Sequence, residues 1–384
     1  MSRPPRFADP RRAFHAWGLL GLVAAILLGA ALTVAGGRSL AMTGVLALAA
    51  VTASGLLVAG STRRGGSRLV YYHHELTILA VSGALLALAG GPVLAYLDIT
   101  VLAVGAFLVF GRLGCLAVGC CHGRPAGHGV RYTPAHAAAG LPAHLVGVPL
   151  LPVQAVESAG VLATVAAGCV LILHAAPGAA LACYVAGYGG LRFGLEFLRG
   201  DAGRPSWAGF TQAQWISLAL CALAVAGHRA GLLPPIGWDE PVLVALLGAM
   251  LTAAGLRRRA ASAHRLRDPQ HVAELAATLA ALARPGPPVR ATSRGLHLSA
   301  GRTATGIGLV THYALSARPD PLTVHQARTV GAVLGRLQDC RPTLLPGATP
   351  GLFHLLIPPP GRPDDVPAGR GTASRGGAVK ARPR

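Results

Sequence analysis

Acidic residues are scarce in the first two thirds of this chain. Of the 14 aspartates and glutamates in its 384 residues, those between Ala13 and Trp238 are Glu75, Asp98, Glu157, Glu196 and Asp201. The same stretch consists mostly of Ala, Leu, Val and Gly, and only 12% of the whole chain is charged. So little charge excludes an ordinary soluble enzyme. It favours a polytopic membrane protein, in which each remaining charge has a partner or a task.

Aromatic residues are also few, and the cysteines lack the spacing of a disulfide framework. Aromatic side chains make up 5% of the chain, and no motif of basic residues interleaved with aromatics is present. We therefore expect no nucleic-acid partner, although the formal net charge is +20. The basic excess after Arg257 suits a tail near anionic lipid headgroups. The seven cysteines do not form an extracellular disulfide pattern. We expect three of them to be small core residues, namely Cys169, Cys183 and Cys221.

Apolar runs of spanning or nearly spanning length are abundant, and the first of them is too long for a cleavable signal peptide. The runs are Trp17–Gly36, Leu40–Gly60, Leu76–Gly91, Val93–Val118, Pro152–Leu173, Gly178–Leu198, Gln212–Gly227 and Pro241–Leu256. Because the last run is short, we expect an all-α polytopic membrane bundle of seven or eight transmembrane helices. A basic N-terminal segment, residues 1–16, precedes a transmembrane domain at 17–256.

The rest of the chain has a different pattern. Helical spacing appears at His271–Ala283 and Leu322–Leu337, whereas Gly295–Ser299, Gly308–Ser316 and Gly351–Ile357 alternate like strands. These elements predict a basic helix and linker at 257–289 and a small C-terminal α+β domain at 290–360. The Pro-, Gly- and Arg-rich residues 361–384 are expected to be a disordered basic tail.

Arg112 follows an apolar helix of spanning length, where hydrocarbon gives way to lipid headgroups. A guanidinium at this depth suits a lipid phosphate, because its planar fork makes two charge-assisted hydrogen bonds. Gly111 and Gly114 beside it allow a lipid or a backbone to approach closely. The alternative is a snorkelling arginine that caps the helix.

Three further segments carry candidate site residues. Arg192 and Glu196 are four residues apart and can pair on one helix face, either to orient the arginine for an anion or to close the bundle. His73 and His74 lie at a predicted membrane edge and suit a general base, although an interfacial aromatic belt is the alternative. Gln154 and Glu157, three apart at the beginning of a helix, can face one cavity.

These residues together resemble the bacterial prolipoprotein diacylglyceryl transferase family. The family motif Tyr-Gly-x-x-Arg-Phe-x-x-Glu-x-x-Arg is matched in full by Tyr188, Gly189, Arg192, Phe193, Glu196 and Arg199. The family signature Gly-Arg-x-Gly-Asn-Phe-x-Asn-x-Glu begins in this chain at Gly111. Its His-Pro-x-Gln-Leu-Tyr-Glu motif is echoed by Pro152, Gln154 and Glu157. Asp98 corresponds to a family aspartate, and His73 or His74 to a family histidine.

The resemblance implies a reaction in the bacterial cytoplasmic membrane. The diacylglyceryl group of phosphatidylglycerol would move to the lipobox cysteine thiol of a prolipoprotein, releasing glycerol phosphate. Arg112 and Arg192 would bind the phosphate, His73 or His74 would help deprotonate the thiol, and Glu196 would position Arg192. Substrate-binding residues would be Gly111, Gly114, Asp98, Gln154, Glu157, Tyr188 and Arg199. The expected partners are phosphatidylglycerol, the prolipoprotein signal peptide and the bilayer, with no cofactor and no metal.

The chain departs from the family signature at its cysteines. Cys115 stands at the signature Asn, and Cys120 at its Glu, followed by Cys121 and His122. Three sulfurs and an imidazole suit zinc, but C-x4-C-C-H lacks the usual C-x2-C spacing. We expect small packing residues beside the glycines, with a reactive or acylated thiol and a metal site as alternatives.

Orientation and rival functions stay open. Arginines at the beginning of the chain and at Arg63 and Arg64 would place the Arg112 loop in the cytoplasm, whereas the family active site opens to the outer face. One rival enzyme keeps the lipid donor but uses another acceptor. A rival of another class is a non-catalytic lipid-binding or sensing protein. A transporter is a weaker rival, because no inverted repeat is evident.

Overall fold

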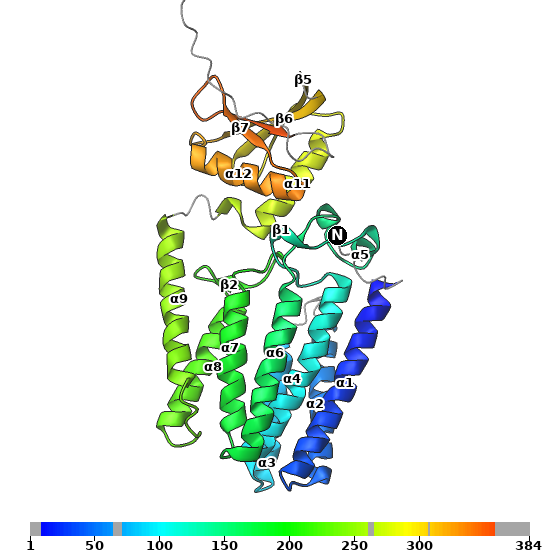
Figure 1. Cartoon of the computed structure of the whole chain (residues 1–384), viewed down its shortest axis with the longest axis vertical. Helices are drawn as coiled ribbons and strands as arrows, with labels where there is room; N and C mark the ends of the chain where they lie inside the picture. The colour runs from blue at the N-terminus through cyan, green and yellow to red at the C-terminus, as the bar shows by residue number, and fades with distance from the viewer. Residues whose placement is uncertain (1–8, 64–70, 260–264, 306–307, 358–384) are drawn as a thin grey trace, which may run out of the picture.

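The computed structural model describes residues 9–63, 71–259, 265–305 and 308–357. The basic residues 1–8 and 64–70 and the predicted disordered tail at 361–384 therefore lie outside the described residues. Long helices lie roughly parallel in one bundle, and a small sheet with two helices sits at one end of it (Figure 1).

The helices of the bundle follow the predicted apolar runs closely. They are α1 (Pro10–Ala35), α2 (Leu40–Arg63), α3 (Tyr71–Leu88), α4 (Val93–Val118), α6 (Val153–His174), α7 (Ala179–Leu195), α8 (Gln212–Arg229) and α9 (Asp239–Arg259). Of the described helices, α1, α2, α4, α6 and α9 are long and apolar enough to cross a membrane. The mostly helical fold with a small C-terminal sheet is thus confirmed. The number of spans, seven or eight, stays a prediction.

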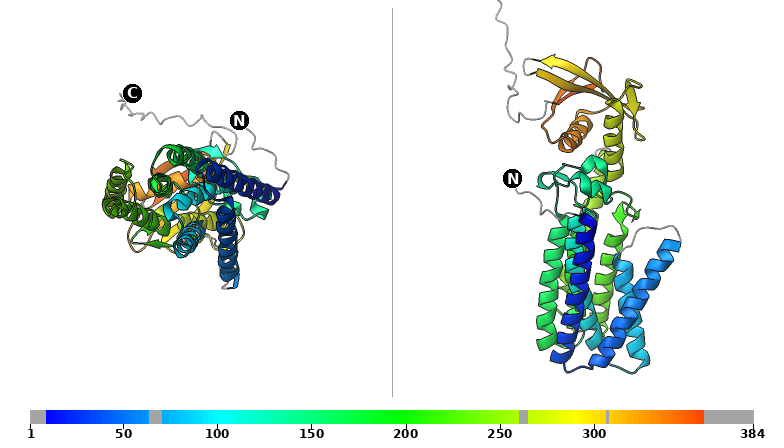
Figure 2. Two further views of the ribbon diagram at one scale, coloured as in Figure 1. Left: turned by 90° about the horizontal axis from the view of Figure 1, so that it is seen from below. Right: turned by 90° about the vertical axis from the view of Figure 1, so that its right-hand side faces the viewer.

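The connections alternate between short and long. Residues 36–39, 89–92, 175–178 and 230–238 join neighbouring helices at one end of the bundle. The longer segments 119–152 and 196–211 lie at the other end, together with the beginning of α1 (Figures 1 and 2). The carboxyl ends of α4 and α7 therefore meet at the same end of the bundle, beneath the long segments.

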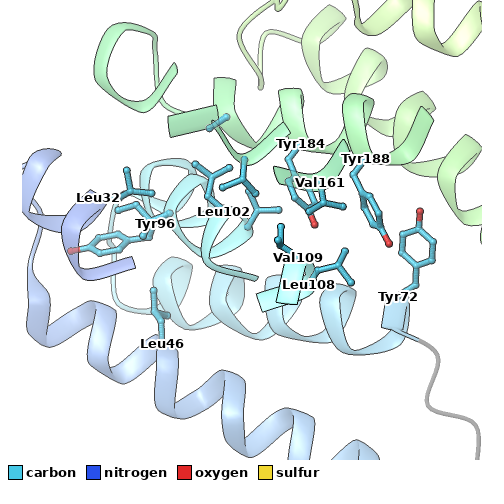
Figure 3. Packing of buried hydrophobic residues seen from close by; sticks show 14 of the residues in the cluster. Leu32, Leu46, Tyr72, Tyr96, Leu102, Leu108, Val109, Val161, Tyr184 and Tyr188 are labelled. Carbon is cyan, nitrogen blue, oxygen red and sulfur yellow. The ribbon is translucent and has the colours of Figure 1, made fainter. Parts of the chain in front are cut away.

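Small residues let α4 pack closely against α6 and α7. A Cβ added at Gly105 would lie 2.6 Å from Tyr184 and 2.7 Å from Val165. A Cβ added at Gly168 would lie 2.4 Å from Leu102. Figure 3 shows Leu102, Val161 and Tyr184 in this buried layer. Close packing of this kind substitutes for the hydrophobic drive that lipid cannot supply.

The C-terminal unit is an antiparallel sheet covered by α11 (Pro269–Leu282) and α12 (Val324–Leu337). Its strand order is β4-β5-β6-β8-β7. The strands are β4 (Val289–Ala291), β5 (Leu296–Thr305), β6 (Gly308–Ala317), β7 (Thr343–Pro346) and β8 (Phe353–Ile357). The expected β-β-α-β elements are present, and the short edge strands β4 and β7 are additional. Leu298, Leu315, Leu334 and Leu355 are fully buried in one core.

The C-terminal unit rests on the segment that follows α4. This segment contains β1 (Pro125–Val130) and α5 (Pro134–Ala138), and it has a small apolar cluster of its own against which Leu337 packs. Arg131 Nη2 lies 2.8 Å from Asp339 Oδ2 in an exposed ion pair. The unit therefore covers the end of the bundle at which α4 and α7 finish (Figure 1).

Candidate active site

Two buried arginines from different helices share one carboxylate. Arg112 Nη2, near the end of α4, lies 2.9 Å from Glu157 Oε1 on α6. Arg192 Nε, near the end of α7, lies 3.8 Å from the same oxygen. The Tyr188 hydroxyl donates to it at 3.1 Å. Glu157 therefore brings together the two guanidinium groups that the sequence placed 80 residues apart.

The ion pairs continue from Arg192 into the segment after α7. Arg192 Nη2 lies 2.6 Å from Glu196 Oε1, and Arg199 Nη1 lies 3.4 Å from the same oxygen. Arg204 pairs with the other oxygen of Glu196. Arg199 also makes an ion pair of 2.7 Å with Asp201. Burial disfavours its charged form, but Cys121, Asp201 and Glu196 raise the pKa of Arg199 above its ordinary value.

This network has capacity for a further anion. Its arginines are Arg112, Arg192, Arg199 and Arg204, and its carboxylates are Glu157, Glu196 and Asp201. Four guanidinium groups against three carboxylates leave one positive charge in excess. Arg112 Nε and Arg192 Nη1 are buried and have no hydrogen-bond partner among the described residues. Because a buried donor without a partner is costly, these two groups favour a bound acceptor.

All members of the network except Glu157 line the polar end of a cavity of about 1920 Å³. This volume exceeds the roughly 300–1,000 Å³ of a pocket for a drug-sized molecule. Apolar residues of α1, α2 and α4 form the rest of the wall, for example Ile26, Val51 and Phe107. Gly111 faces this space, with no atom within 4 Å of an added Cβ. A polar end joined to a long apolar wall is the shape of a site for an amphipathic molecule.

The two histidines lie at the beginning of α3 and line the same cavity as Arg112. The exposed ring of His73 lies 3.2 Å from Gln212 Nε2 at the beginning of α8. The neighbouring Tyr72 bonds to Ser217 at 2.8 Å, and its ring lies 5.9 Å from that of Tyr188 (Figure 3). The structure therefore brings both candidate bases and both arginines to one cavity.

Residues 75–228 match the family model of the prolipoprotein diacylglyceryl transferases. This match confirms the resemblance that the motifs indicated, over less than half of the chain. It runs from α3 to the end of α8 and includes the whole ion-pair network. No curated protein and no solved structure matches the chain.

The transferase resemblance also suggested residues that the structure places outside the network. Asp98 lies near the opposite end of α4, where it accepts the backbone N–H groups of Gly178 and Leu181 at 2.7 Å each. Gly114 packs against Phe14 and Trp17 of α1. Gln154 donates to the Cys120 carbonyl at 2.8 Å. A direct role for Asp98, Gly114 or Gln154 in substrate binding stays a prediction.

Arg204 was missed by sequence reasoning. It lies in the irregular segment after α7, outside the motif that ends at Arg199, and it also lines the cavity. The available signal was its spacing of three residues from Asp201, with which it makes an ion pair of 3.7 Å. Spacing alone was a weak signal, because it is meaningful on a helix and this segment is not helical.

Proposed function

We propose that this protein transfers the diacylglyceryl group of phosphatidylglycerol to the lipobox cysteine thiol of a prolipoprotein. One observation carries the proposal. Arg112 and Arg192 converge on the same oxygen of Glu157 at the polar end of a large, mostly apolar cavity. The family match over residues 75–228 supports transferase chemistry at the level of the family.

The donor lipid would bind with its acyl chains along the apolar wall formed by α1, α2 and α4. Its phosphate carries one negative charge, equal to the positive excess of the ion-pair network. Arg112 Nε and Arg192 Nη1 would donate to the phosphate oxygens, because both N–H groups lack another acceptor within the described part of the chain. Glu157 holds the two guanidinium groups in place until the phosphate arrives.

In the transfer step, the incoming thiolate sulfur attacks the carbon of the diacylglyceryl group that is bonded to a phosphate oxygen. A carbon–sulfur bond forms as the carbon–oxygen bond breaks, and the bonding pair leaves on the glycerol phosphate oxygen. His73 or His74 accepts the thiol proton, since the thiolate is the nucleophile. The leaving group gains a negative charge, and Arg112 and Arg192 stabilise it.

The test is complementation of a strain depleted of its own transferase. We expect the wild-type chain to restore the mass of a diacylglyceryl-modified reporter lipoprotein. Arg112→Gln and Arg192→Gln should each lower turnover by about 10²–10³-fold, as loss of a charge-stabilising donor does. Arg131→Gln is the matched control, because that arginine lies in an exposed ion pair outside the network. Failure of the wild-type chain, expressed well in membranes, would reject this acceptor.

A second candidate keeps the lipid donor and changes the acceptor. Cys115 and Cys120 stand where the family signature has Asn and Glu, and both line the cavity, so the acceptor side of the site differs in chemistry. Lipid mass spectrometry of overexpressing cells separates the two candidates, because a different acceptor gives a new lipid product. Binding of phosphatidylglycerol without any turnover would instead support a lipid-binding role.

A further inference from the structure

Three cysteine thiols meet at the polar end of the cavity. The sulfur atoms of Cys115, Cys120 and Cys121 all lie within 4.8 Å of one another. None of them is in a disulfide. Such a cluster differs from Cys169, Cys183 and Cys221, which lie singly on α6, α7 and α8.

The backbone reverses to make this cluster. Cys115 lies in the last turn of α4, and Gly119 ends the helix in the left-handed conformation, with φ of 81°. Cys121 is also left-handed, with φ of 53°, although such a conformation is unfavourable for a residue with a Cβ. The turn returns Cys120 and Cys121 onto the end of the helix.

The spacing of the sulfurs suits a metal ion. Zinc–sulfur bonds of about 2.3 Å in a tetrahedron separate the sulfurs by about 3.8 Å. The observed cluster therefore needs shifts of about 1 Å or less to close around an ion, which side-chain rotation can supply. The sequence spacing disfavoured a metal site because Cys120 and Cys121 are adjacent. The two adjacent thiols nevertheless reach the same point as Cys115, because the strained backbone of Cys121 turns there.

The surroundings suit the charge and geometry of such a complex. Cys115, Cys120 and Cys121 line the same cavity as the positively charged Arg112 and Arg199. Gln154 holds the carbonyl of Cys120, as groups around metal ligands commonly do. His122 is buried beside the cluster, and its Nδ1 lies 3.0 Å from the Gly123 carbonyl.

We propose that Cys115, Cys120 and Cys121 bind a thiophilic metal ion, Zn²⁺ or Cu⁺, at the polar end of the cavity. Both ions prefer thiolate ligands and accept three of them. The site goes beyond the proposed transferase activity and does not depend on it. It would fasten the end of α4, and with it Arg112, to the segment that follows.

The test measures metal in the full-length protein, purified in detergent from cells supplied with zinc or with copper. We expect about one ion per chain by mass spectrometry of the metal, and the two supplies identify which ion binds. Cys115→Ser, Cys120→Ser and Cys121→Ser should each lower the metal content at least tenfold, whereas Cys169→Ser is the matched control and should keep it. Cobalt substitution should give thiolate-to-metal charge-transfer absorption in the wild-type chain and in Cys169→Ser, but not in the three variants of the cluster.

Two measurements remain informative if one of the other serine variants folds poorly: the metal content of Cys120→Ser and the alkylation of the wild-type chain. Cys120 is exposed, so Cys120→Ser should retain the elution volume and helical content of the wild type. The metal content of this variant therefore decides whether the cluster binds metal. In the wild-type chain, an alkylating reagent should spare the three clustered thiols until a chelator is added. Metal content equal in wild type and Cys120→Ser would overturn the proposal. A disulfide within the cluster, detected by intact mass, would overturn it as well.

Discussion

The membrane bundle and the C-terminal unit both bury apolar side chains, but they differ in where their charged and their exposed apolar side chains lie. In the bundle, charged residues such as Arg112, Glu157 and Glu196 are inside, while Leu27 of α1 is 64% exposed. In the C-terminal unit, Leu298 and Leu315 are fully buried and form the core. The difference shows which solvent each region is built for. Lipid leaves polar groups to find partners inside, whereas water drives apolar groups together.

Glu157→Leu should give the largest effect, because two buried guanidinium groups lose a shared acceptor. Removing one partner of a buried ion pair costs about 3–5 kcal/mol. Thermal unfolding of the detergent-solubilised protein measures this loss. Val156→Leu is the control, since that side chain is exposed on the same helix. A loss no larger than that of the control would mean that the network contributes little to the stability of the bundle.

Leu315→Ala should destabilise the C-terminal unit by about 2–5 kcal/mol, as expected for a cavity in a water-driven core. Hydrogen exchange should accelerate in β5, β6 and β8 while α4 and α6 keep their protection. Leu345→Ala on β7 is the control, because its side chain is exposed. Equal acceleration in both regions would show that bundle and sheet unfold as one unit.

Gly105→Ala should cost about 1–3 kcal/mol by overpacking the contact of α4 with Tyr184 and Val165. Gly44→Ala adds the same methyl group to α2, where nothing lies within 4 Å. Unfolding midpoints of the two variants in detergent test the difference. If Gly105→Ala has the same unfolding midpoint as Gly44→Ala, α4, α6 and α7 can move apart without a loss of stability.

Arg131→Gln should have the smallest effect, under about 1 kcal/mol, because an exposed ion pair is weakened by water and salt. A double-mutant cycle with Asp339→Asn measures the coupling between the two side chains. Coupling above that value would mean that this pair, rather than apolar contact, holds the C-terminal unit on the bundle.

The predicted helices follow from apolar runs that a membrane requires, and the bounds of α4 agree with the run Val93–Val118. The α1 helix begins earlier than Trp17, at Pro10, because Asp9 caps it and Pro is favourable in the first turn. The edge strands β4 and β7 were missed because three or four residues show no reliable alternation.

The site was predictable where its contacts are local. Arg192 and Glu196 pair at 2.6 Å, as four-residue spacing on a helix suggested. The contact of Arg112 with Glu157 joins two helices, and no spacing along the chain encodes it. The meeting of Cys115 with Cys120 and Cys121 depends on left-handed residues, which apolar patterning does not reveal.

Asp98 fixes the relative positions of α4 and α7, and with them those of the two arginines at the far end of the bundle. It sits on α4 and fixes the first turn of α7 through Gly178 and Leu181. Arg112 follows Asp98 by 14 residues, and Arg192 follows Gly178 by 14 residues. At about 1.5 Å per residue, the Cα atom of each arginine lies about 21 Å along its helix from that common anchor. One carboxylate near the opposite end of the bundle thus sets the Cα atoms of the two arginines at similar heights along it.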